Sequence, residues 1–176
     1  MRKEAVILLC WVTMMISSMQ IFAQGFTKTS AVGVKIQQSI AIAEIRPMHF
    51  GTMTVKASQG GTCVVSTAGV RSRTGGVTLS NLMPQMSLAT YLVTGEPGRS
   101  YAITLPSTIT VVYNSHSMVI NNLLAKPASG VQSHTATGTL SVSGSEQFTI
   151  GATLNVAAGQ EEGLYTGTFN ITVAYN

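Results

Sequence analysis

The sequence predicts an all-β protein, and three observations support this fold class. Apolar and polar residues alternate with a period of two in several short runs, as expected for strands with one buried face and one wet face. Turn signals rich in glycine and proline, such as Gly95–Gly98, separate these runs. No stretch after the amino terminus sustains a helical period. Many short strands with frequent turns are typical of an antiparallel β-sandwich.

The first residues predict a secretory signal peptide over residues 1–23. Arg2 and Lys3 give a positive start, Ala5–Ile16 is apolar, and Ala23 provides a small residue after which cleavage is expected. The apolar run is shorter than the roughly 20 residues that a membrane-spanning helix needs. We therefore expect a bacterial protein that is exported to the periplasm, the cell surface or the medium, with no membrane span.

Cleavage there leaves a single predicted domain, residues 24–176, in which residues 24–31 are a candidate N-terminal extension. Eight basic and five acidic residues then remain, so the net charge falls from +4 to near +3. Cys63 becomes the sole cysteine, which excludes an intrachain disulfide. Because no basic residue flanks it, we expect a small buried apolar residue and not a reactive thiol.

The first alternating run is Val32–Ile42, which is either a donor segment for a partner or the domain's own first strand. Asn122–Ser129 fits a short helix or a loop, and its composition does not separate the two. The other short alternating or β-branched runs are predicted strands, namely Thr62–Ser66, Ala89–Thr94, Tyr101–Leu105, Ile109–Tyr113, Met118–Ile120, Gly138–Ser143, Phe148–Ile150 and Thr153–Val156.

The carboxyl terminus has the sharpest alternation, which runs unbroken from Tyr165 to Asn176. Each large apolar side chain there contributes roughly 1.5–3 kcal/mol when fully buried. Five of them together rival the net stability of a typical domain, which is about 5–15 kcal/mol. We therefore predict a strand that either its own domain or a partner must cover.

Gly163–Asn176 resembles the terminal strand of chaperone–usher pilus (fimbrial) subunits. These subunits typically have a penultimate tyrosine and a glycine 14 places from the end, and Tyr175 and Gly163 occupy those positions. The resemblance implies an immunoglobulin-like, pilin-like sandwich that lacks one strand. An assembly chaperone, and later the amino-terminal extension of the next subunit, would add that strand.

Most of residues 45–176 is also similar to an uncharacterised family of bacterial secreted domains, known as a domain of unknown function. This similarity implies a fold and an exported location but no activity. Its matching pieces are His49–Gly51, Val93–Gly95, Tyr101–Pro106, Phe148–Leu154 and Gly163–Asn176.

The residues argue against catalysis. The chain has no aspartate, which excludes a Ser-His-Asp triad, an Asp-based metal cage and an EF-hand. Nucleophile-elbow, P-loop and dinucleotide-binding motifs are missing. His49, His116 and His134 are widely spaced and are expected in turns or at the surface, and Glu161–Glu162 in a solvated loop. We predict that the protein is not an enzyme and holds no cofactor or metal.

Charge and aromatic content limit other binding functions. The basic residues are scattered, so nucleic-acid binding is not expected. The densest cluster, Arg71–Arg73, is predicted to be a solvated loop. Four aromatic residues are candidates for a sugar-binding face, although core or cross-strand packing is the preferred interpretation. They are Tyr91, Tyr101, Tyr113 and Phe148.

Two function hypotheses follow. The first is a secreted, pilin-like surface-assembly subunit that joins an assembly chaperone or like subunits by β-strand exchange. The second is a self-contained secreted adhesion or glycan-binding module that folds alone and whose glycan ligand is unknown. In the first hypothesis the partner strand contacts one parity of the terminal segment, which comprises Gly163, Tyr165, Gly167, Phe169, Ile171, Val173 and Tyr175.

Overall fold

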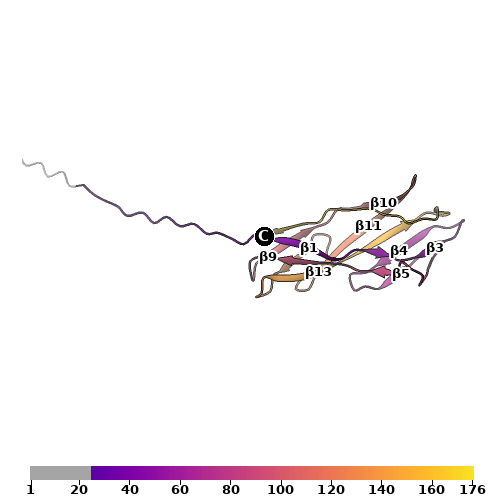
Figure 1. Cartoon of the computed structure of the whole chain (residues 1–176), viewed down its shortest axis with the longest axis horizontal. Coiled ribbons are helices and arrows are strands. Elements are labelled where there is room, and N and C mark those ends of the chain that lie inside the picture. The colour runs from indigo at the N-terminus through magenta and orange to yellow at the C-terminus, as the bar shows by residue number, and fades with distance from the viewer. Residues whose placement is uncertain (1–24) are drawn as a thin grey trace, which may run out of the picture. The chain divides into compact units, whose positions relative to one another are not determined.

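The computed structural model describes residues 25–176, so the predicted signal peptide lies outside the described residues. The chain divides into a unit that ends at Lys35 and a unit formed by Ile36–Asn176. In the first unit, residues 25–35 have neither helix nor strand and are exposed throughout. The second unit is all-β, with antiparallel strands and no helix among its residues, which confirms the predicted fold class (Figure 1).

The larger sheet has seven strands arranged around one long central strand, β13 (Ser145–Val156). On one edge, β13 pairs with β8 through its first half and with β4 through its second half, and on the other edge it pairs with β11. The remaining strands of this sheet are β1 (Ala41–Arg46), β4 (Gly61–Val65), β5 (Arg71–Arg73), β8 (Ala89–Thr94), β10 (Ile109–Tyr113) and β11 (His116–Pro127).

Three smaller sheets complete the unit. One has the order β12-β9-β14, formed by Thr137–Thr139, Ser100–Thr104 and Thr172–Tyr175. The two others are strand pairs, which are β2 (His49–Phe50) with β7 (Met86–Ser87), and β3 (Met53–Val55) with β6 (Val77–Leu79).

The core lies between the inward faces of the large sheet and of β9. Along β8 every second residue is buried, so the alternation seen in the sequence corresponds to burial on one face. Phe148 of β13 stacks on Tyr91 with ring centroids 5.3 Å apart, while Tyr101 and Ile103 of β9 are fully buried. This arrangement is a β-sandwich.

Several local predictions are confirmed. Ala89–Thr94 and Ile109–Tyr113 form strands with the predicted bounds, and Thr62–Ser66 and Tyr101–Leu105 are each shifted by one residue. Met118–Ile120 lies within β11. Phe148–Ile150 and Thr153–Val156 are not two strands, because β13 runs unbroken through Gly151.

Other local predictions are wrong. Asn122–Ser129 is neither helix nor loop up to Pro127, because β11 continues there past a bulge at which Asn122 has a φ of 50°. Gly138–Ser143 is a strand only up to Thr139. Of the two alternatives for Val32–Ile42, the domain's own first strand is contradicted, because only the last two residues lie in a strand, the start of β1.

Arg71–Arg73 is also not a solvated loop. It forms β5, which pairs with β4. The Arg71 guanidinium donates to the carbonyl oxygens of Phe50 at 3.0 Å and Ser80 at 2.7 Å. Arg73 donates to the Val77 carbonyl at 2.8 Å. Both arginines therefore bond to backbone carbonyls on or beside the short strands β2 and β6.

Candidate functional site

The carboxyl-terminal segment, residues 163–176, forms the candidate site by running from one sheet to another. Thr166 exchanges two backbone hydrogen bonds with Val112 of β10, at 2.9 and 3.1 Å. Farther on, β14 pairs with β9 in the register Thr172↔Thr104. The intervening residues 167–171 are in no strand. The prediction of one continuous twelve-residue strand is therefore wrong, although both of its ends are paired.

The gap in this strand has a local cause. If the β14–β9 register continued toward the amino-terminal side, Asn170 would lie opposite Pro106. Proline has no backbone N–H and cannot donate to a ladder. The pairing with β9 therefore ends at Thr104, and the chain turns toward β10.

Two glycines permit the close approach to β10. A Cβ on Gly163 would lie 2.2 Å from the Tyr113 ring, and one on Gly167 would lie 2.5 Å from the Thr110 carbonyl oxygen. Both distances are far shorter than a carbon contact allows, so a larger residue at either position would force the segment or its neighbour on β10 to move. The Gly163 found by sequence analysis thus has a steric role against Tyr113.

The predicted parity of the segment is the observed one. The apolar side chains at odd positions from Phe169 to Tyr175 are half-buried against the core, and the alternate residues are exposed. Gly163 and Gly167 are themselves exposed, and Tyr165 is half-buried. None of the large side chains of this set is fully covered. The terminal alternation predicted a strand that had to be covered, and these side chains are only partly covered.

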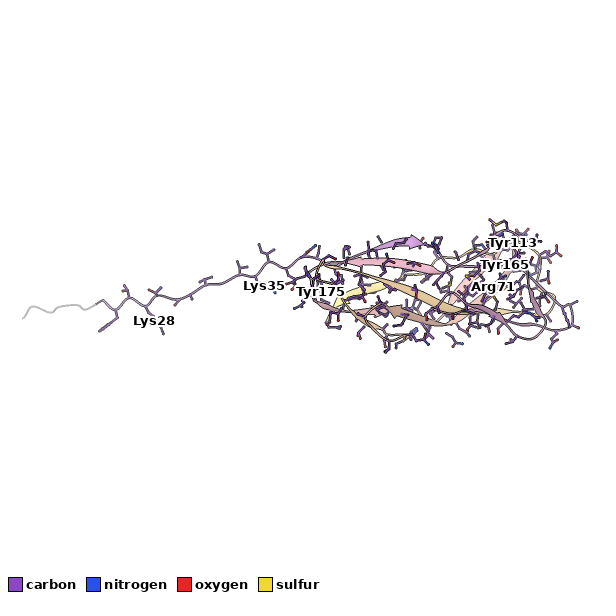
Figure 2. All side chains as sticks on the ribbon, turned by 90° about the horizontal axis from the view of Figure 1, so that it is seen from below. Lys28, Lys35, Arg71, Tyr113, Tyr165 and Tyr175 are labelled. Carbon is purple, nitrogen blue, oxygen red and sulfur yellow. The ribbon has the colours of Figure 1, made fainter. Side chains whose placement is uncertain are left out.

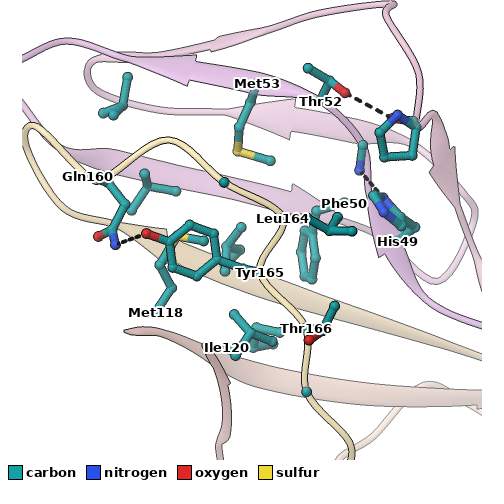
Figure 3. Close-up of a pocket in the computed structure, with 18 of the residues that line it drawn as sticks. His49, Phe50, Thr52, Met53, Met118, Ile120, Gln160, Leu164, Tyr165 and Thr166 are labelled. Atoms are coloured by element: carbon teal, nitrogen blue, oxygen red, sulfur yellow. Dashed lines mark hydrogen bonds between the residues drawn. The ribbon is translucent and has the colours of Figure 1, made fainter. Parts of the chain in front are cut away.

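An open apolar groove of about 700 Å³ lies along this segment (Figure 3). One wall is the run from Met48 to Val55, which contains β2 and β3, and the other is formed by residues 160–169. The floor consists of inward-facing side chains of β10, β11 and β13. They are Ile109, Val111, Met118, Ile120, Leu154 and Val156.

A second hollow of about 220 Å³ lies farther along the same segment, between it and β1. Ile42 and Glu44 of β1, with Tyr91, line it on one side, and residues 169–171 line it on the other. Phe169 borders both hollows. We use the term exchange groove for the two hollows together. It lies between the chain's 42–55 region and its 160–171 region.

The exchange groove is flanked by strand edges that carry no partner in the described chain. β1 pairs only with β8, and residues 167–171 belong to no ladder. A peptide group at such an edge must bond to water or to another chain. Exposed apolar side chains occur at the same edge, since Ile42 is 36% exposed and Ile45 51% exposed.

Polar groups lie at the rim of the groove and not on its floor. The Tyr165 hydroxyl accepts from Gln160 Nε2 at 2.8 Å and donates to the Glu161 carbonyl at 3.0 Å. Tyr165 also packs on Tyr113 with ring centroids 5.7 Å apart. Figure 2 shows these two tyrosines near one end of the sandwich and Tyr175 near the other. Glu161 and Glu162 are exposed, in agreement with the predicted solvated loop.

Glu44 is the acidic group beside the second hollow. Tyr91 donates its hydroxyl to Glu44 Oε2 at 3.1 Å. Burial of the phenol, and then the hydrogen bond and charge of Glu44, raise the pKa of Tyr91. The tyrosine therefore stays neutral at physiological pH and acts as a fixed donor to the carboxylate.

The other candidate residues are dispersed. His49 Nδ1 accepts from the Gly51 N–H at 2.9 Å, His134 Nδ1 donates to the Leu123 carbonyl at 3.1 Å, and His116 is exposed at a hairpin. Among residues 25–176, no three histidine, cysteine or acidic side chains are grouped to hold a metal ion. Within the same residues, no helix is long and apolar enough to cross a membrane.

The core predictions for Cys63 and the aromatic residues are largely confirmed. Cys63 is fully buried, and that burial raises the pKa of its thiol against a smaller opposing effect of Arg71. Tyr91, Tyr101 and Phe148 are core residues and do not form an exposed face. Tyr113 differs, since it is half-buried and packs on Tyr165 at the rim.

The sequence pattern did not predict one wall of the groove. Met48, Phe50, Met53 and Val55 lie on or beside strands of two or three residues, which are too short to show a period. The available signal was two pairs of apolar residues, each spaced two positions apart, Met48 with Phe50 and Met53 with Val55, but no strand was predicted there.

These features define a class of protein, an all-β sandwich with an open apolar groove beside its last strand. Residues 40–175 match the family described as Domain of unknown function (DUF4402). The chain belongs to this family, which confirms the expected membership in an uncharacterised family. No curated protein and no solved structure matches the chain.

Proposed function

We propose that this protein is a secreted surface-assembly subunit of pilin-like type, whose domain joins its partners by β-strand exchange. The observation that carries the proposal is the exchange groove, an apolar channel between two regions of unpaired strand edge. A strand inserted there would bond to backbone groups at its edges and place alternate side chains on the apolar floor. This is the β-strand-addition mode of recognition.

The energetic argument rests on exposed apolar surface. Residues of both groove walls, such as Phe50, Met53 and Phe169, are only half-buried. Filling a groove with three or four large apolar side chains would contribute roughly 1.5–3 kcal/mol for each one fully buried. Covering the β1 edge would also remove a site at which chains aggregate. Both effects favour an occupied groove over an open one.

The chain carries a segment suited to fill the groove of another copy. Val32, Val34 and Ile36 share one parity and are 97%, 90% and 90% exposed, and Phe26 on the same parity is 92% exposed. The segment is basic, with Lys28 and Lys35, whereas the groove is bordered by Glu44, Glu161 and Glu162. Apolar alternation over residues 32–36, together with exposure and positive charge over residues 26–36, supports this segment as the donor strand.

The site does not suggest catalysis. Apolar side chains form the floor of the groove, and its titratable groups lie at the rim with ordinary structural partners such as the Tyr91–Glu44 bond. We propose a non-enzymatic role in which the chain needs no cofactor or metal, and in which an assembly chaperone or a like subunit supplies the strand. Export through the predicted signal peptide agrees with this role.

The test is to detect strand-exchanged multimers in cells that produce the full chain. The sheared surface fraction is run in a detergent gel with and without boiling and is blotted for the protein. We expect a ladder that collapses on boiling to one band of mature size. Val34→Asp should abolish the ladder without unfolding the monomer, because Val34 is 90% exposed. Val142→Asp, at a position 96% exposed but outside the segment, is the matched control and should keep the ladder.

A single mature-sized band in both lanes, with soluble monomer, would contradict the proposal and favour a self-contained adhesion or glycan-binding module. If Val34→Asp and Val142→Asp both kept the ladder, strand exchange would stand but the donor would not be residues 26–36.

A further inference from the structure

One hydroxyl group joins three separate parts of the domain. The Tyr175 hydroxyl accepts from the Glu96 backbone N–H at 2.6 Å and donates to the Gln38 carbonyl at 3.0 Å. The Arg99 guanidinium lies over the same ring, 5.5 Å from its centroid. The end of the chain, the β8–β9 loop and the backbone just before β1 therefore meet at this side chain. Figure 1 shows the carboxyl terminus beside the start of β1.

The surrounding backbone is shaped to admit this hydroxyl. Gly95 is buried next to it, and a Cβ at that position would lie 2.2 Å from the Tyr175 hydroxyl oxygen. Gly95 is itself fixed, because its N–H donates to the Gly144 carbonyl at 2.9 Å. Any side chain at residue 95 would displace the tyrosine hydroxyl from its two hydrogen bonds.

Gln38 lies at the root of the proposed donor segment. Residues 25–39 are exposed and in no strand, and β1 begins at Ala41. At the other side, Tyr175 ends β14, which continues from Phe169 and Ile171 at the exchange groove. The Tyr175–Gln38 bond thus connects the strand that borders the acceptor groove to the backbone from which the donor segment leaves.

We propose that Tyr175 is a positioning residue, the Tyr175 latch, that couples the acceptor groove of a subunit to the root of its donor segment. This inference rests on the proposed function. A strand that pairs with residues 167–171 restrains them, and the restraint passes along β14 to Tyr175 and then to Gln38. Such coupling is reciprocal. A strand in the groove favours formation of the Tyr175–Gln38 bond by the same factor by which that bond raises the affinity of the groove for the strand.

The latch is tested first in the chain without added ligand. Hydrogen exchange is measured in the mature chain carrying Val34→Asp, which keeps it monomeric. Adding Tyr175→Phe should speed exchange in residues 38–43 by about two- to fivefold, the effect of losing one partly exposed hydrogen bond. Gly95→Ala should have the same effect, because it displaces the hydroxyl and leaves the tyrosine in place.

Tyr165→Phe is the matched control. It removes a hydroxyl from the same segment, but that hydroxyl contacts only Gln160 and Glu161. Exchange in residues 38–43 should therefore stay as in the parent. If Tyr175→Phe also left this region unchanged, the latch would be overturned.

The coupling is tested with a synthetic peptide that has the sequence of residues 26–36. At saturation we expect the peptide to slow hydrogen exchange in residues 38–43 of the parent chain but not of the Tyr175→Phe chain. We also expect the peptide to bind the Tyr175→Phe chain more weakly, by the same factor as it slows exchange in the parent. Equal binding with equal protection in both chains would overturn the latch and leave strand exchange intact. A peptide that does not bind either chain would overturn the donor assignment and the coupling, while the free-chain comparison would still decide whether Tyr175 holds the root.

Discussion

The two sides of the sandwich core differ in how completely they are packed. On one side, between β13 and β9, Phe148 is 1% exposed and Tyr101 fully buried. On the other side, along the exchange groove, Phe50, Met53 and Phe169 are only half-buried around a hollow of about 700 Å³. Both sides consist of apolar and aromatic side chains on strands whose apolar and polar residues alternate. The difference is the number of strands available to cover them.

Native interiors are packed as densely as organic crystals, so an apolar hollow of this size is unusual for a core that is complete. We call the β13–β9 side the closed side and the groove side the open side. In the proposed function, the closed side stabilises the isolated domain and the open side binds a strand. Mutations that have equal chemistry on the two sides should separate these contributions.

The largest expected effect is on the closed side. Phe148→Ala should lower the free energy of unfolding by about 3–5 kcal/mol, since it leaves a cavity in a fully packed core and removes the ring stacked on Tyr91. Urea unfolding of the mature chain measures this loss. Phe169→Ala makes the same change on the open side, where a half-buried ring should cost only about 1–2 kcal/mol.

Urea unfolding of both variants is then repeated in the presence of the peptide of residues 26–36. When the groove is occupied, the cost of Phe169→Ala should rise by more than that of Phe148→Ala, because Phe148 meets the groove only through the Tyr91 ring on which it stacks. Equal costs for the two variants without peptide would mean that the open side is packed as well as the closed side.

This contrast also shows what the sequence could predict. A period of two is a local property, so it identified β4, β8, β9 and β10 and the correct parity of the terminal segment. The pairing of that segment is not local. It depends on Pro106, which lies 64 positions before Asn170 in sequence but opposite to it in the extended register. Sequence alone therefore predicted one strand where the chain changes partners.

The groove was predictable only in part, for the same reason. The alternation of the terminal segment predicted one wall. The other wall contains β2 and β3, which are too short to show a period. The sequence did not predict the continuation of β11, because the strand has a bulge at Asn122 and the residues from there on resemble a loop. Cys63 was simpler, because its flanking residues alone indicate burial.

A smaller effect is expected where the terminal segment meets β10. Gly163→Ala should lower the free energy of unfolding by about 1–3 kcal/mol, because its Cβ would overlap the Tyr113 ring. Removing the ring relieves the overlap. Adding Gly163→Ala to a Tyr113→Ala chain should therefore cost much less than adding it to the parent, which a double-mutant cycle by urea unfolding measures. Strictly additive costs would show that the glycine has no steric role at this contact.

The smallest effect is one of pH, and it involves two core tyrosines, of which only Tyr91 lines a hollow of the groove. Tyr101 lies beside the Glu146 carboxylate at a geometry outside the usual hydrogen-bond limits, and burial, followed by that carboxylate, raises its pKa. Tyr91 at the second hollow has its pKa raised mainly by burial and then by Glu44. In the unfolded chain both phenols ionise near the ordinary value of 10.0.

Because the folded-state pKa values are higher, these phenols contribute their full stability below pH 10 and lose it as the pH rises further. Ionisation of these two phenols should change the free energy of unfolding little between pH 7 and pH 9 and should lower it above pH 10. Tyr101→Phe and Tyr91→Phe should each make the fall less steep. Occupying the groove with the peptide should cover Glu44, the exposed partner of the Tyr91 hydroxyl at the second hollow, and change only the part of the slope that Tyr91→Phe removes. If the peptide changed the Tyr101 part equally, the two sides of the core would not be independent, and the division into a closed and an open side would fail.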